Sequence, residues 1–284
     1  MTNIQALRKF NQAQDTSSKV IEFLKEFNDG DICDFEYHRS VIETYILRNK
    51  TIPAILPSFP GKPINPNLAP SHIPDGAEEY AIRKLKEMIA GVEKIYAPGI
   101  NIKLFHDGYY FIHLAMDYDY YRMQEYVDTI KLLCKDSDIT SIDLKNVTEG
   151  STFEARMNYW NCLYYPTEEE VNTYNRLYPE VYSGMVAFFY NHFSRYLYPH
   201  KSNLFRRKVS KYIARNYVVV NMSVQNYIKD HFKDDLRLSV KKQDSPASQK
   251  FYVDILQGIE NYGLPWMNTL IEENGRKVIK KFRD

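Results

Sequence analysis

The loop Pro57–Asn67 places one cation, Lys62, among prolines and small or polar residues. Proline fixes φ and lacks a backbone donor, so this loop is expected to leave the preceding apolar run as a stiff, irregular segment. Such loops often carry ligand contacts in α/β proteins. Lys62 could therefore neutralise a phosphate or a carboxylate, or bind a carbonyl oxygen. A simply solvated lysine is the alternative.

A second candidate is His106-Asp107-Gly108, which follows the apolar run Asn101–Phe105. At the end of a strand, Asp107 could accept a proton or bind an amine, with His106 beside it. The competing interpretation is structural, because Asp-Gly between two apolar runs is typical of a β-hairpin turn.

A third candidate is Leu236–Lys241, where apolar and polar residues alternate as in a half-buried strand. The alternation places Arg237, Ser239 and Lys241 on one face. Two cations and a hydroxyl on one face require an anion or acidic partners. Both an oxyanion or phosphate site and a structural ion pair fit this pattern.

The segment Lys201–Lys229 contains cations and no acidic residue. Its cations are Lys201, Arg206, Arg207, Lys208, Lys211, Arg215 and Lys229. A solvated basic helix face explains them most simply. One or two of them could instead bind a phosphate, or the segment could bind a polyanion such as RNA.

Several common sites are missing from the sequence. It has no glycine-rich dinucleotide fingerprint, no P-loop and no nucleophile elbow, so a nucleotide cofactor is not indicated. The His, Cys and Asp residues also lack the spacing of a metal site.

The composition is that of a soluble globular protein: 284 residues, 44% hydrophobic, 26% charged and a net charge of +1. This charge predicts no general affinity for nucleic acid or anionic lipid. No apolar run is long enough for a membrane helix, and the first residues lack a secretory pattern. Three dispersed cysteines favour the reducing cytoplasm.

The hydrophobic periodicity predicts alternating strands and helices. We expect strands over Thr51–Leu56, Asn101–Phe105, Tyr109–Leu114, Ser141–Asn146, Leu236–Val240 and Phe251–Leu256, and a hairpin over Thr269–Phe282. We expect two helices within Ser17–Asn49, one after the capping box Asp75–Glu78, one around Met123–Cys134, and mostly helix over Thr167–Ile228, which opens with a second capping box.

This order predicts an α/β fold with a Rossmann-like mixed sheet flanked by helices, a largely helical insertion and antiparallel C-terminal strands. We expect residues 1–284 to form one domain. Its core would span about 50–150 and 231–284, and a helical subdomain would span about 151–230.

Taken in order, several of these stretches resemble the isocyanide (isonitrile) synthase family, also called the pyoverdine/dityrosine biosynthesis family. The matching stretches, which cover roughly residues 50 to 270, are Leu56–Lys62, Asn65–Asn67, Pro74–Glu78, Ile95–Gly99, His106–Phe111, Ser210–Asn216, Leu236–Val240 and Leu264–Trp266.

The resemblance implies an enzyme that converts the amine of an amino acid, usually tyrosine or tryptophan, to an isonitrile. The carbon would come from the ketone carbon of ribulose 5-phosphate, without a metal or redox cofactor. The implied pathway partner is an iron- and 2-oxoglutarate-dependent oxygenase. No nucleic-acid or membrane partner is implied.

This chemistry assigns expected roles to the candidates. The catalytic residues would be Asp107 or His106 as the base, Lys62, and Ser239 to polarise a carbonyl oxygen. The substrate and phosphate ligands would be Ser58, Lys211, Arg215, Arg237 and Lys241.

Three residues differ from the family's pattern. Gly61 occupies a position that is commonly aromatic, and Lys241 and Met267 occupy positions where a histidine is usual. The sequence therefore leaves open a relative that condenses ribulose 5-phosphate with a different amine, as well as a non-catalytic protein that binds anions or RNA.

Overall fold

Five parallel strands form the centre of the molecule. We describe them from a computed structural model covering residues 3–28, 30, 33–63, 65, 69, 71–111, 120–242, 249–259, 264–267, 269–273 and 276–280. The strands are β1 (Ile52–Pro57), β2 (Ile100–Phe105), β3 (Ile139–Ile142), β4 (Leu236–Ser239) and β5 (Phe251–Tyr252). They lie in the order β3-β2-β1-β4-β5, and each neighbouring pair is parallel.

Strands are added on one side of β1 first and on its other side later, so β1 is the point where the strand order reverses. The chain builds β1, β2 and β3 toward one edge, then returns to add β4 and β5 on the other side of β1. In open parallel sheets, ligands bind outside the carboxyl ends of the strands at such a reversal. The ends of β1 and β4 are therefore where a site is expected.

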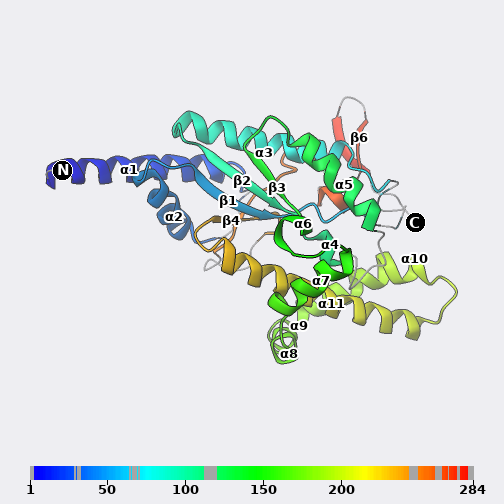
Figure 1. Cartoon of the computed structure of the whole chain (residues 1–284). Helices are drawn as coiled ribbons and strands as arrows, with labels where there is room; N and C mark the ends of the chain where they lie inside the picture. The colour runs from blue at the N-terminus through cyan, green and yellow to red at the C-terminus, as the bar shows by residue number, and fades with distance from the viewer. Residues whose placement is uncertain are drawn as a thin grey trace.

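Helices cover both faces of the sheet (Figure 1), with α3 and α5 on one side and α11 on the other. The longer helices are α1 (Asn3–Lys25), α2 (Phe35–Leu47), α3 (Gly76–Ile95), α5 (Tyr120–Leu133), α7 (Phe153–Tyr164), α8 (Glu168–Leu177), α9 (Pro179–Phe189) and α11 (Asn203–His231). The short ones are α4 (Gly108–Phe111), α6 (Leu144–Val147), the π-helix η2 (Tyr190–Ser194), α10 (Arg195–Leu197) and the 3-10 turn η3 (Pro265–Met267).

Local signals in the sequence explain where α3 begins and which side it buries. The Asp75 side chain accepts a hydrogen bond from the Ala77 amide, and the Glu78 side chain accepts one from the Asp75 amide, so the predicted capping box is confirmed. Leu85 and Val92, at helical spacing, are fully buried. α3 therefore covers the sheet with the apolar side that the sequence predicts.

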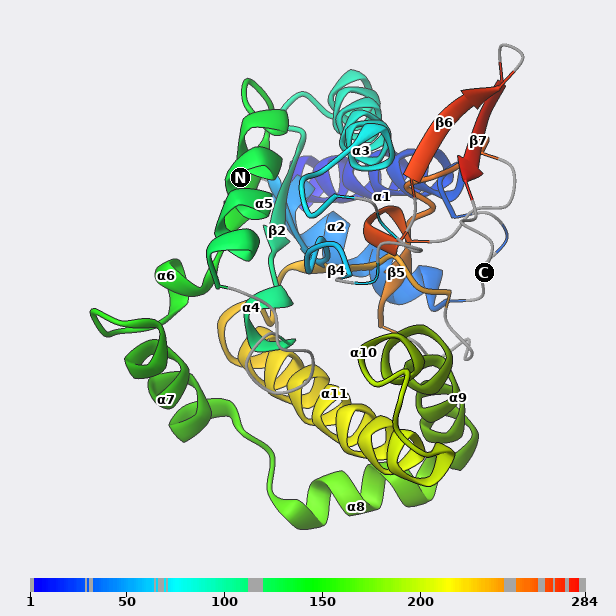
Figure 2. The same ribbon diagram turned by 90° about the vertical axis from the view of Figure 1, so that its right-hand side faces the viewer.

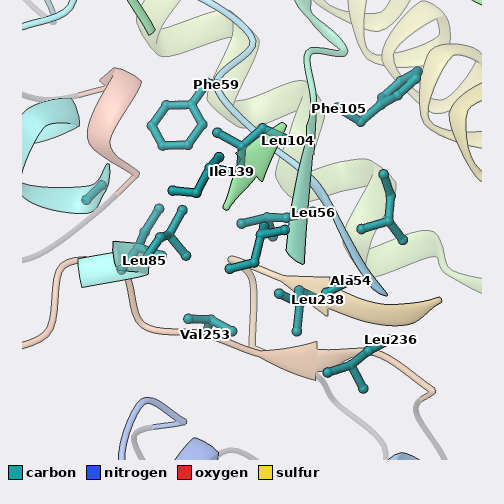
Figure 3. Packing of buried hydrophobic residues seen from close by; sticks show 14 of the residues in the cluster. Ala54, Leu56, Phe59, Leu85, Leu104, Phe105, Ile139, Leu236, Leu238 and Val253 are labelled. Atoms are coloured by element: carbon teal, nitrogen blue, oxygen red, sulfur yellow. The ribbon is translucent and has the colours of Figure 1, made fainter. Parts of the chain in front are cut away.

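The two faces of the sheet differ in chemistry. Ala54, Leu56, Leu104, Leu236 and Leu238 form an apolar face that packs with Leu85 of α3 (Figure 3). The alternate residues on the other face are more polar and aromatic. Of these, Phe105 packs on Tyr227 of α11, with the ring centroids 5.4 Å apart. The pleat of the strands thus separates a dry core from a mixed layer under α11.

The sheet corrects part of the predicted fold. The prediction of a mixed sheet with antiparallel C-terminal strands is wrong, because β4 and β5 are parallel to β1. The chain between β3 and β4 is helical and returns along the sheet, so it can start another parallel strand. The last strands, β6 (Thr269–Glu273) and β7 (Arg276–Lys280), pair as an antiparallel hairpin in a separate two-stranded sheet (Figure 2). The division into a core and a helical subdomain stays a prediction.

Asp107-Gly108 is not a hairpin turn. After β2 the chain passes directly into α4, so the predicted strand Tyr109–Leu114 is wrong at its start, and its remainder at 112–119 lies outside the described residues. A Cβ on Gly108 would lie 1.8 Å from the backbone oxygen of Pro60. Glycine is required here for the close approach of the Pro loop rather than for a turn.

We predict that Gly108→Ala destabilises the protein by about 1–3 kcal/mol, because the backbone of the Pro loop must move. The matched control is Gly184→Ala in α9, where a Cβ would meet no atom within 4 Å. This control should be neutral or stabilising by up to about 1 kcal/mol. Urea unfolding of both variants tests the prediction, and equal stabilities would contradict it.

Candidate functional site

The two residues that follow β2, His106 and Asp107, lie in different surroundings. The backbone amide of His106 continues the ladder by donating to Ile142 of β3. Asp107 follows the alternation of Lys103 and Phe105, whose side chains lie on the α11 side. Asp107 and His106 are therefore neighbours in sequence but belong to different environments.

Asp107 lies at the carboxyl end of β2 in a half-buried position. Its Oδ1 atom is inaccessible to solvent and has no hydrogen-bond partner among the residues that the structure describes. Burial raises the pKa of Asp107 to about 7, and the charge of Lys241 partly opposes this rise. A carboxyl group with this pKa can take up and release a proton near neutral pH.

Lys241 follows β4 and reaches α11. Its Nζ atom donates to the hydroxyl of Tyr217 at 2.9 Å and lies 5.4 Å from the centre of the same ring. Tyr217 is the main cause that raises the pKa of Lys241, burial opposes it, and Asp107 and Tyr174 raise it further. Asp107, Lys241, Tyr217 and Tyr174 therefore interact electrostatically at one end of the sheet.

Ser239 fixes the turn that carries Lys241. The Ser239 hydroxyl accepts a hydrogen bond from the Lys241 amide at 3.1 Å and donates to the Lys241 carbonyl at 3.0 Å. Such a local side-chain turn stabilises the departure of the chain from β4. Ser239 thus orients the lysine that faces Asp107.

Arg237 lies two residues earlier on the same side of β4. Its guanidinium donates to Gln225 of α11, and burial lowers its pKa. Lys241 lies beyond the end of β4, and its partner Tyr217 lies eight residues before Gln225 on α11. The β4 segment and α11 therefore run in opposite directions. We call the Arg237–Gln225 and Lys241–Tyr217 contacts the two rungs.

A hollow of about 160 Å³ lies at the ends of β4 and β5. Its lining includes Val240, Lys242, Tyr252, Asp254 and Pro265. Lys242 lies 5.8 Å from the centre of the Tyr252 ring. The hollow lies at the carboxyl edge of the sheet, where the strand order leads one to expect a site, but Asp107, Arg237, Ser239 and Lys241 are not among its lining residues.

Other predicted site residues lie in the core of the molecule. His106 is fully buried, with Nε2 at hydrogen-bond distance from the hydroxyl of Ser141 and Nδ1 from the carbonyl oxygen of Phe59. Burial lowers the pKa of His106 to about 4, so the imidazole is a weak base at neutral pH. Ser58 is also buried, and its hydroxyl donates to the carbonyl of Leu56.

Lys62 lies between two carboxylates at the start of α3. Its Nζ atom is 2.8 Å from Glu78 and 3.0 Å from Asp75, and the side chain is 1% exposed. It also donates to the carbonyl of Pro265 at 3.4 Å. Burial raises the pKa of Glu78 to about 7 despite the opposing effect of Lys62. These contacts join the Pro loop, α3 and η3.

Lys211 and Arg215 lie on α11, on sides away from the rungs. Arg215 donates to Glu168 and Asn172 of α8, both at 3.2 Å. Lys211 is exposed. The structure therefore groups Asp107, Arg237, Ser239 and Lys241 and places Lys62, Ser58, His106, Lys211 and Arg215 in other surroundings. The catalytic and binding roles of all nine residues stay predictions.

The sequence analysis did not single out Tyr217, Tyr174, Gln225 or Lys250. Tyrosine is abundant in this chain, so its frequency gave no reason to prefer two of 24. Tyr217 and Gln225 reach the end of β4 from α11, Tyr174 lies on α8, which contacts α11, and Lys250 directly precedes β5. These neighbours are set by tertiary packing and not by spacing in the sequence.

The described residues contain no group of three or more His, Cys, Asp or Glu side chains arranged to hold a metal ion. None of the helices among them is both long and apolar enough to cross a membrane.

We predict that Lys62→Met destabilises the protein by about 3 kcal/mol, because it leaves Glu78 and Asp75 without their shared cation. The double variant Lys62→Met/Glu78→Gln should recover part of this loss, since the buried acid is then neutral. Urea unfolding of both variants measures the effect. A single variant as stable as the wild type would show that the ion pairs have no structural importance.

The sequence is similar to proteins of known activity. The pattern of the family described as "Pyoverdine/dityrosine biosynthesis protein" matches residues 42–283. L-tryptophan isonitrile synthase AmbI1 of Fischerella ambigua (strain UTEX 1903) is 29% identical over 242 residues, which cover 82% of this chain and 74% of the relative. L-tyrosine isonitrile synthase of Xenorhabdus nematophila is 23% identical over 252 residues, which cover 84% and 74%.

The fold is also shared with a solved structure. The crystal structure of PvcA from Pseudomonas aeruginosa matches with a TM-score of 0.83 and 20% sequence identity, and the match covers 94% of this chain and 92% of that one. The family pattern covers most of the chain, and the fold agrees with it. The chain therefore belongs to the pyoverdine/dityrosine biosynthesis family.

Proposed function

We propose that this protein is an isonitrile synthase that converts the amine of tyrosine or tryptophan to an isonitrile, with ribulose 5-phosphate as the carbon donor. Two kinds of evidence support the proposal. Relatives that share most of the chain's length are named as tryptophan and tyrosine isonitrile synthases. The observation that carries it is Asp107, a carboxyl group with a pKa near neutrality at the carboxyl edge of the sheet.

The reaction first requires an uncharged amine. An amino acid carries an ammonium group at neutral pH, and this group cannot attack a ketone until it loses a proton. Asp107 is suited to accept that proton. With a pKa of about 7, a substantial fraction of the carboxyl group is ionised at neutral pH, and the carboxylate is a stronger base than that of an ordinary aspartate. The Oδ1 atom of Asp107 has no described hydrogen-bond partner, so no described protein group competes with the substrate amine for it.

The ketone must also be polarised. When nitrogen attacks, a C–N bond forms and the carbonyl oxygen gains negative charge. The two protons of the neutral amine then leave with that oxygen as water, which gives an imine. In the proposal, the Lys241 ammonium stabilises the developing charge, and Ser239 and Tyr217 position it through their hydrogen bonds.

An aromatic amino acid needs apolar walls. Tyr217 supplies one ring next to Lys241, and Phe189 of α9 packs on Tyr217 with the centroids 5.5 Å apart. Tyr174 of α8 lies close enough to Lys241 to interact with its charge. Aromatic rings of this kind bind another ring through offset or edge contacts. They support tyrosine or tryptophan as the substrate.

The product would leave as a carbon–nitrogen compound ready for oxidation. An iron- and 2-oxoglutarate-dependent oxygenase is the proposed partner in the pathway.

The exposed cations on α11, such as Lys208 and Lys211, support the alternative of an anion- or RNA-binding protein. Affinity for RNA that falls steeply with salt, in a protein that consumes no ribulose 5-phosphate, would favour this alternative.

The proposal predicts that the protein, incubated with a mixture of amino acids and ribulose 5-phosphate labelled at its ketone carbon, forms a labelled isonitrile. Mass spectrometry should show an amino acid that has gained one carbon atom and lost two hydrogen atoms. Use of an amine other than an amino acid would favour the family relative with a different substrate.

In the same assay, Asp107→Asn should lower turnover by about a hundredfold or more, because the amide cannot accept the proton. The control is Asp15→Asn on α1, where the carboxylate is exposed and pairs only with a lysine one turn away among the contacts described. It should leave turnover unchanged. Full turnover by Asp107→Asn would remove Asp107 from the role of base.

A further inference from the structure

Lys250 lies just before β5 and close enough to Arg237 for the two charges to interact. It directly precedes Phe251, which is in register with Leu238 of β4. Residues in register on parallel strands point to the same side, and the alternation places Lys250 on the side of Arg237 and Tyr252 on that of Ser239. The strand pair therefore brings a second cation next to the Arg237 guanidinium.

The three cations of this face interact with one another. Burial is the main cause that lowers the pKa of Lys250 to about 8, and the charges of Arg237 and Lys241 lower it further. Lys241 in turn interacts with Asp107. Arg237 and Lys250 are half-buried, whereas Lys241 is exposed.

A dianion would balance this charge. Holding like charges together away from bulk water costs free energy, and an anion with two charges offsets it. A phosphoryl group carries close to two negative charges at neutral pH. Arg237 offers a planar fork and Lys250 a point charge, which are the two kinds of cationic donor that bind phosphate oxygens in proteins.

The two contacts with α11 indicate how a ligand would be oriented along β4. The contact between Arg237 and Gln225 lies toward the middle of the sheet, whereas that between Lys241 and Tyr217 lies at its carboxyl edge, with Asp107. A ligand along β4 would therefore have its anionic end near Arg237 and Lys250 and its reacting carbon near Asp107.

We propose that Arg237 and Lys250 form the subsite for the phosphoryl group of the phosphorylated ketose, with Lys241 nearer the reacting carbon. This inference rests on the proposed function, and it adds Lys250 as a binding residue. It also assigns the phosphate to the face of β4 that α11 covers, rather than to Lys62, Lys211 or Arg215.

The test is titration calorimetry at neutral pH with inorganic phosphate, ribulose 5-phosphate and unphosphorylated ribulose. The wild type should bind both phosphate-containing ligands, and ribulose at least tenfold more weakly. Lys250→Met should weaken ribulose 5-phosphate binding about tenfold and leave amino-acid binding within twofold. Lys250→Arg, which keeps the charge, should retain most of the affinity.

The matched control is Lys94→Met, an exposed lysine near the end of α3, which should bind like the wild type. Circular dichroism checks that each variant is folded, and Lys250→Arg together with Arg237→Lys replaces Lys250→Met if that variant does not fold. Arg237→Lys should lose affinity several-fold because the fork is missing.

The subsite is overturned if the wild type binds none of the phosphate-containing ligands, or if Lys250→Met binds ribulose 5-phosphate as tightly as the wild type. These measurements need no turnover. Binding that depends on Lys250 without any isonitrile product would support the subsite and refute the proposed function. Isonitrile formation by Lys250→Met with an unchanged KM for the ketose would refute the subsite alone.

Discussion

The pleat of an all-parallel sheet is the constraint on which the rest of this structure depends. All five strands point the same way, so their carboxyl ends lie along one edge. Successive side chains at that edge alternate between the two helix layers. Asp107 and Lys241 therefore meet under α11, whereas His106, one residue away from Asp107, is buried on the other side.

Burial then gives these groups different chemistry. It raises the pKa of Asp107 and lowers that of His106, because in each case it disfavours the charged form. His106 is held between Ser141 and Phe59 and stabilises the packing of the Pro loop on the sheet. Asp107 is instead left with an oxygen atom that has no described partner, which is what a substrate requires.

Lys62 and Lys241 have different roles because they lie in different surroundings. Lys62 is almost fully buried between Asp75 and Glu78, so its charge is engaged in joining loop, helix and 3-10 turn. Lys241 has an exposed surface and contacts a tyrosine hydroxyl, and its charge acts on Asp107. Lys241 therefore supplies a cation and a hydrogen-bond donor that interact with the Asp107 carboxylate and the Tyr217 hydroxyl.

Local patterns were sufficient for much of the fold. The capping boxes at Asp75 and Thr167 and the strand at Ile52–Pro57 depend on neighbours in sequence, and the structure contains all three. The alternation at 236–241 also predicted that Arg237 and Lys241 share a side. The direction of β4 and β5 and the role of Gly108 could not be predicted, because they depend on the return path of the chain and on Pro60. The same holds for Lys250, which is near Arg237 only through strand pairing.

The central claim is that Asp107 is buried beside Lys241 under α11, and titration of the Asp107 carboxyl group tests it most directly. Carbon-13 NMR of selectively labelled aspartate, assigned with Asp107→Asn, should give a pKa of about 7. In Lys241→Met the pKa should be higher, because the cation that favours ionisation is gone. A pKa near that of a solvated aspartate, unchanged in Lys241→Met, would contradict the account.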